Sequence, residues 1–123
     1  MSEDRPVIRL HLWLENDSGL FFGMGRAQLL QQIARLGSIK KAAEELSMSY
    51  RAAWGKIKKS EEILGVKLVI QNASKREGCQ LTEAGRELLE KYLLWFTTVE
   101  QEALKRAEEI LPWSVKGFKS DID

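Results

Sequence analysis

Apolar residues recur every three or four positions along most of this chain, a spacing that predicts helices. The expected helices cover residues 25–36, 39–46, 50–64 and 82–111. Alternation of apolar and polar residues over 8–14 predicts a strand with one buried face, and a turn at 16–19 leads to a returning strand at 20–22. Residues 66–70 and 79–81 are expected to form two further short strands.

Turn and cap residues join the second and third of these helices closely. Gly37 ends the preceding helix, and Ser38 is placed to cap the next one. Ser47 and Met48 form the turn, and Ser49 caps the third helix. Two helices joined by so short a turn predict a helix-turn-helix, the arrangement that lays its second helix in the major groove of DNA.

The third helix separates its side chains into two faces when it is projected at about 100° per residue. The expected core face consists of Ala53, Ile57, Ser60 and Leu64. The opposite face carries long cations around a residue with no side chain: Arg51, Gly55, Lys58 and Lys59. We expect Trp54, at the edge, to join the core.

A face of this kind suits DNA, because cations contact phosphates or guanine edges and the glycine lets the helix backbone approach. We expect Arg51 to read a base. Tyr50, Lys58 and Lys59 are expected to contact phosphates, and the helix caps at Ser38 and Ser49 to present amide groups to the DNA backbone. The opposing interpretation is that the lysines form a solvated surface.

A turn-rich loop at 72–78 lies between the two later strands and has Lys75 and Arg76 near its tip. A basic hairpin directly after the third helix is typical of a winged helix, in which the loop contacts phosphate or the minor groove. The alternative is a solvated hairpin. The predicted fold is therefore mainly α with small β: a winged helix-turn-helix over residues 1–111, followed by a frayed tail at 112–123.

Charge supports this division. Residues 38–76 hold nine cations against four carboxylates, a net charge of +5, whereas residues 83–111 hold four cations against seven carboxylates, a net charge of −3. A local basic surface is what counterion release from DNA requires, and the whole-chain charge of +1 hides it.

The pattern G-S-I…A…S-Y-x-x-A-W, here from Gly37 to Trp54, resembles the N-terminal winged helix-turn-helix of ModE-type molybdenum-responsive regulators. LTEAG (residues 81–85) is similar to the wider LysR-type group of bacterial regulators. The resemblance covers about residues 8–110 and implies DNA binding. ModE regulators continue into a molybdate-binding half that has no counterpart among these residues, so the resemblance does not imply molybdate sensing.

The long helix at 82–111 extends beyond so small a domain, and its apolar residues predict a second function. Steps of three and four are typical of a helix pair, which predicts a two-fold homodimer reading a near-palindromic site. The expected dimer interface is Leu89, Tyr92, Phe96, Val99 and Ala103. Alternatively this helix folds back on its own domain through the N-terminal hairpin, and both arrangements can hold for different faces.

The chain has one cysteine, Cys79, and one histidine, His11, which excludes a disulfide within the chain and leaves too few ligands for a cysteine–histidine metal cluster. No cofactor or enzyme motif stands out, and no long apolar run predicts a membrane span or a signal peptide. We expect a cytoplasmic, prokaryotic transcriptional regulator whose partner is double-stranded DNA. The alternative is a winged-helix module that binds protein or RNA. Whether an unidentified effector or protein partner also binds is left open by the sequence.

Overall fold

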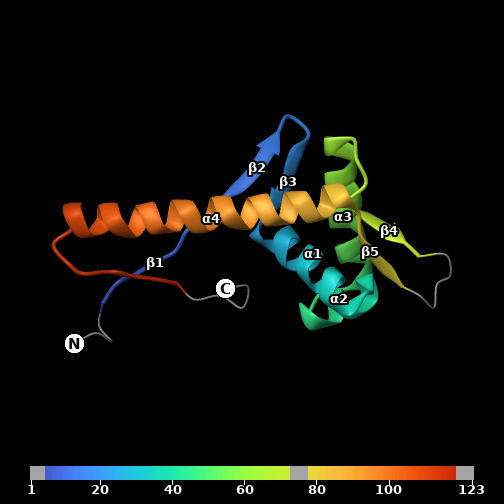
Figure 1. Cartoon of the computed structure of the whole chain (residues 1–123), viewed down its shortest axis with the longest axis horizontal. Coiled ribbons are helices and arrows are strands. Elements are labelled where there is room, and N and C mark those ends of the chain that lie inside the picture. The colour runs from blue at the N-terminus through green and yellow to red at the C-terminus, as the bar shows by residue number, and fades with distance from the viewer. Residues whose placement is uncertain (1–4, 73–77, 119–123) are drawn as a thin grey trace.

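The computed structural model describes residues 5–72 and 78–118, and it places the shorter elements around one end of a long helix (Figure 1). The outer half of this helix projects away from them and is accompanied by two short terminal strands. The elements in chain order are β1 (Val7–Ile8), β2 (Trp13–Asn16), β3 (Gly19–Gly23), α1 (Met24–Leu36), α2 (Ile39–Glu45), α3 (Tyr50–Leu64), β4 (Val69–Gln71), β5 (Cys79–Leu81), α4 (Glu83–Ile110) and β6 (Lys116–Gly117).

The predicted helices and caps are confirmed. Ser38 accepts a hydrogen bond of 3.1 Å from the amide of Lys41, and Ser49 accepts one of 3.0 Å from the amide of Ala52. Thr82 caps α4 in the same way. Gly37 and Gly65 end α1 and α3 in the left-handed conformation that glycine tolerates. These local signals mark the starts of α2, α3 and α4 and the ends of α1 and α3.

The core lies where α1, α2 and α3 meet β3, the β4–β5 hairpin and the first half of α4. Its fully buried members are mostly aliphatic, with small alanines where helices cross closely, which lets α2 approach its neighbours. The central residues are Phe22, Leu29, Leu30, Ile33, Ala42, Ala43, Ala53 and Leu68.

The predicted N-terminal strand is wrong as a continuous element. β1 pairs in parallel with β6, whereas β2 pairs antiparallel with β3, so residues 9–12 change partner and are not strand. The predicted buried face also fails at its end, because Leu14 is exposed. The intervening Leu12 carbonyl instead accepts a hydrogen bond from Tyr92 on α4.

The prediction of a frayed C-terminal tail is wrong for residues 115–117. β6 pairs with β1, and the amide of Lys116 donates to the carbonyl of Pro6. The preceding Val115 is 6% exposed, and Ala107 on α4 is also buried. The chain therefore returns along the outer half of α4, where Figure 1 shows the red segment after α4 running close to the segment labelled β1.

The inner face of α4 contradicts part of the predicted dimer interface. Leu89 and Tyr92 are buried inside the subunit, with Tyr92 3% exposed and its ring 5.3 Å from that of Phe22. Phe96 packs against the same core. Folding back on the domain, the alternative interpretation, is therefore confirmed for this face. Val99 and Ala103 are half-buried, and Leu94 on the other side is 69% exposed.

No helix within the described ranges is long and apolar enough to cross a membrane.

Candidate nucleic-acid interface

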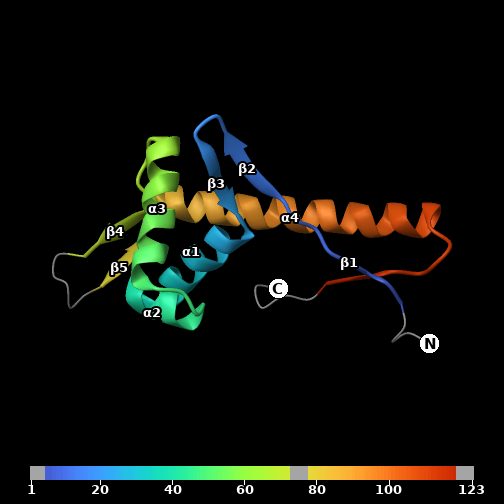
Figure 2. The same ribbon diagram turned by 180° about the vertical axis from the view of Figure 1, so that it is seen from behind.

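Helix α3 lies on the outside of the helical cluster, between the β4–β5 hairpin and the β2–β3 hairpin (Figure 2). Ala53, Ile57 and Ser60 face inward as predicted, and the hydroxyl of Ser60 donates to the carbonyl of Phe21. The opposite side of α3 is exposed at Arg51, Gly55 and Glu62.

Arg51 and Gly55 lie on this outer side, as predicted. Both are exposed, and a Cβ atom built on Gly55 would meet no atom within 4 Å. The glycine is therefore not required by packing within the subunit. It leaves a shallow place on the outer face where another backbone can approach, next to a guanidinium able to pair with guanine.

The prediction that Trp54 joins the core is wrong. Trp54 is 44% exposed, because it lies about 100° around the helix from Ala53, which already fills the contact with the core. Tyr50, one turn earlier, is exposed as well. The solvent-exposed part of α3 thus carries two aromatic rings beside Arg51.

The structure does not bring Lys58 and Lys59 together. The Lys58 ammonium lies 5.3 Å from the centre of the Trp54 ring and forms an ion pair with Glu61. Lys59 points to the other side, where a Cβ atom on Gly19 would lie 2.8 Å from its Nζ atom. The Lys58 side chain therefore lies on the side of α3 that faces β4, whereas the Lys59 side chain lies beside the turn of the β2–β3 hairpin.

The β4–β5 hairpin lies where a wing was predicted, beside α3, with Val69 opposite Leu81. The amide of Cys79 donates to the carbonyl of Gly37, which ties the hairpin to the turn between α1 and α2. The predicted contacts Lys75 and Arg76 lie outside the residues that the structure describes. The hydrogen bond between Cys79 and Gly37 fixes the base of the hairpin to the helical cluster.

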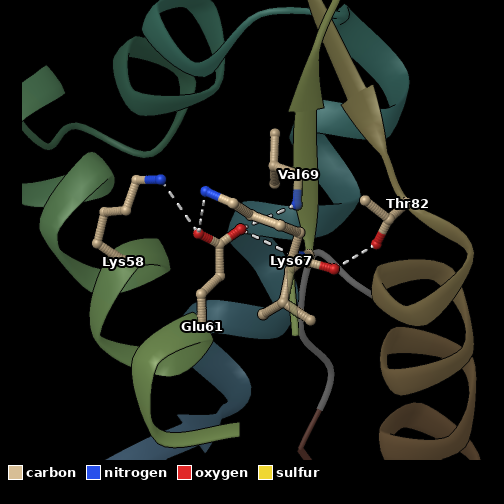
Figure 3. A network of polar contacts seen from close by, with 6 residues as sticks. Lys58, Glu61, Lys67, Val69 and Thr82 are labelled. Atoms are coloured by element: carbon tan, nitrogen blue, oxygen red, sulfur yellow. Dashed lines mark hydrogen bonds and ion pairs between the residues drawn. The ribbon is translucent and has the colours of Figure 1, made fainter. Parts of the chain in front are cut away.

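Glu61 is a central residue that the sequence interpretation counted only as a charge. Its side chain is buried, and Oε2 accepts hydrogen bonds of 2.8 Å from the amide of Leu68 and 3.2 Å from that of Val69. Its Oε1 forms ion pairs with Lys58 at 3.3 Å and Lys67 at 3.8 Å (Figure 3). The signal that could have found it is its position, one turn after the buried Ile57.

Burial by itself would raise the pKa of Glu61, but the two amide hydrogen bonds and the Lys58 ammonium outweigh it and hold the pKa below its ordinary value. The carboxylate is therefore charged at neutral pH and joins α3 to the first strand of the hairpin. The adjacent Lys58 ammonium lowers the pKa of Lys67, as like charges do.

A groove of about 430 Å³ runs between α3 and β4. Its apolar lining includes Trp54 and Ile70, and its polar lining is Lys58, Glu61, Lys67 and Gln71. Two cations against one carboxylate leave the groove with a positive charge. A cationic groove beside an exposed helix fits a polyanion that follows both elements.

Comparison with known proteins agrees with this geometry. ModE, a molybdenum transport protein of Azotobacter vinelandii, is 36% identical over 113 residues, which cover 90% of this chain and 41% of that protein. The molybdenum-pterin-binding protein MopB of Rhodobacter capsulatus is 35% identical over 77 residues, which cover 61% of this chain and 28% of that protein. The chain thus spans less than half the length of these relatives.

Solved structures share the fold. The CbnR DBD in complex with DNA superposes with a TM-score of 0.57 at 22% identity, covering 72% of this chain and 97% of that one. Full-length CbnR complexed with its target DNA gives 0.56 at 25% identity, covering 70% and 29%. The predicted winged helix-turn-helix is confirmed. Residues 24–86, just over half of the chain, match the bacterial regulatory helix-turn-helix proteins of the lysR family, and this protein belongs to that family.

Proposed function

We propose that this chain is the DNA-binding domain of a cytoplasmic transcriptional regulator, with α3 as the recognition helix. The observation that carries the proposal is the outer face of α3, where Arg51 and Gly55 lie together and are not covered by any of residues 5–72 and 78–118. The family match and the relatives that form DNA complexes support it.

In this proposal Arg51 contacts a guanine edge in the major groove, and Gly55 lets the helix lie close to the bases. Tyr50 contacts the sugar-phosphate backbone. The first turns of α2 and α3, which Ser38 and Ser49 cap, present amide groups to phosphates. We propose that Lys75 and Arg76, in the loop between β4 and β5, contact phosphate or the adjacent minor groove.

Two copies would place two recognition helices in successive major grooves about 34 Å apart on a near-palindromic site. Because Leu89 and Tyr92 are buried within the subunit, we propose a dimer surface on the outer side of α4, centred on the exposed Leu94 and Trp95. An isolated exposed leucine is common, but one beside a half-exposed tryptophan on a projecting helix favours a partner helix.

Selection of bound duplexes from a random library, followed by sequencing, tests this function. We expect enrichment of one motif with two related half-sites. Absence of enrichment, together with equal affinity for duplex DNA and single-stranded RNA, would contradict sequence-specific DNA binding.

A further inference from the structure

Three charged side chains meet in the groove between α3 and β4, and one of them is buried. Glu61 lies beneath Lys58 and Lys67, and a single carboxylate oxygen, Oε1, forms ion pairs with both ammonium groups (Figure 3). The two lysines come from different elements, since Lys58 is in α3 and Lys67 lies in the turn before β4. Packing of the core does not explain why both are directed to this one atom.

The backbone beneath the cluster is fixed on both sides. Glu61 accepts the amides of Leu68 and Val69 through Oε2, which leaves Oε1 for the lysines. The carbonyl of Lys67 accepts a hydrogen bond of 2.6 Å from Thr82, the cap of α4. Lys67 is thus held at its main chain, whereas its side chain is 68% exposed at the mouth of the groove.

The charges in the cluster do not cancel. Two ammonium groups share one carboxylate, which leaves one net positive charge and mutual repulsion between the lysines. An anion of charge −1 placed over the ammonium groups would neutralise the cluster and relieve that repulsion. A phosphate diester carries this charge, and its oxygens accept hydrogen bonds from lysine.

We propose that Lys58 and Lys67 form a phosphate-binding site for the DNA backbone, and that Glu61 is a positioning residue that holds both lysines in place. This inference rests on the proposed function and deepens it. It adds Lys67, which the sequence did not single out, and it assigns Lys58 to the groove beside β4 instead of the outer face of α3. The site lies between the recognition helix and the wing, so one phosphate bound there would lie next to both elements.

Salt dependence of binding to a random duplex tests the two lysines. Each phosphate contact adds about 0.9 to the slope of log affinity against log salt. Affinity falls by some factor when salt is raised from about 50 mM to about 200 mM, and we expect this factor to be about 3.5 times smaller for Lys67→Ala than for the wild type. The control is Lys105→Ala, an exposed lysine far along α4, which should leave the slope unchanged.

Glu61→Gln tests the positioning role because two explanations predict opposite signs. Removal of a negative charge near DNA raises affinity if charge alone matters. If Glu61 positions the lysines, affinity for all duplexes falls although the protein has become more positive. Glu62→Gln, an exposed neighbour on the same helix, is the matched control and should keep or raise affinity. A thermal melt establishes that each variant is folded.

Outcomes for this site and for the proposed function are distinguishable. If the wild type binds its selected site but Lys67→Ala has an unchanged salt slope, the phosphate site alone is overturned. Higher affinity in a folded Glu61→Gln would overturn the positioning role. If Glu61→Gln does not fold, Lys67→Ala together with Lys58→Ala decides, because both side chains reach solvent. Failure of the wild type to bind any duplex would overturn the proposed function and the site together.

Discussion

The hydroxyl of Tyr92 donates a hydrogen bond of 2.7 Å to the carbonyl of Leu12, a residue 80 positions earlier in the chain. This bond joins α4 to the segment before β2 and turns the tyrosine ring into the core beside Phe22. Burial of the hydroxyl raises the pKa of Tyr92, so it is a donor throughout the neutral range. The inner face of α4 therefore stabilises the subunit and is not free for a partner.

Tyr92→Phe removes the hydrogen bond and keeps the ring, and it leaves the Leu12 carbonyl without this donor. We expect the free energy of unfolding to fall by about 1 kcal/mol. The mass of the assembly measured by sedimentation equilibrium should not change. A variant of unchanged stability whose dimer dissociates would place Tyr92 at the subunit interface instead.

Leu94→Glu introduces a charge on the proposed dimer surface, where the wild-type leucine is exposed. Because no core contact is lost, we expect the free energy of unfolding of the dilute protein to change by no more than about 0.5 kcal/mol. Self-association should weaken strongly. Gln101→Glu, an exposed position further along α4, is the matched control; dimers that resist Leu94→Glu at micromolar concentration would refute this surface.

The elements that the sequence predicted correctly are those specified by local interactions. Ser38, Ser49 and Thr82 cap helices through amides three residues away, and Gly37 and Gly65 end them by a conformation that depends on one residue. Periodicity then identified the inner face of α3. None of these features needs knowledge of a distant contact.

The features that the sequence did not predict depend on pairs far apart in the chain. The return of β6 requires β1 as its partner, and the inward turn of Tyr92 requires Leu12. Helical spacing alone cannot tell an apolar face that meets the core from one that meets another subunit. Glu61 was missed because its amide donors follow it by seven and eight residues, across the end of the helix.

The two helical glycines Gly55 and Gly85 should respond to alanine in opposite ways. At Gly55 the new Cβ meets nothing, so Gly55→Ala should stabilise the fold by up to about 1 kcal/mol and yet weaken binding to the selected DNA site. At Gly85 a Cβ would lie 2.2 Å from the Leu68 carbonyl oxygen, so Gly85→Ala should destabilise the fold. Denaturant unfolding and fluorescence anisotropy measure the two effects; tighter DNA binding by Gly55→Ala would argue against close approach at this position.

The buried carboxylate of Glu61 should make the free energy of unfolding depend on pH in the acidic range. Its pKa is lower in the folded state than in the unfolded chain, so its contribution is complete above the unfolded value of about 4.5 and is lost as pH falls through the folded value. We expect Glu61→Gln to lower the free energy of unfolding at pH 7 by about 1–3 kcal/mol. The difference from wild type should shrink in acid, and a difference that stays constant from pH 7 to pH 3, roughly the range spanning carboxylate titration, would contradict the assignment.

Arg51 provides the most direct test of the outer face of α3 as the surface that reads DNA. The measurement is the affinity of the wild type and Arg51→Ala for the selected site, for its single-base variants and for a random duplex. We predict a loss of about 1–3 kcal/mol on the selected site, relaxed preference at one base position and a much smaller loss on random DNA. An equal loss on specific and random duplexes, or no loss on either, would contradict base reading by this face.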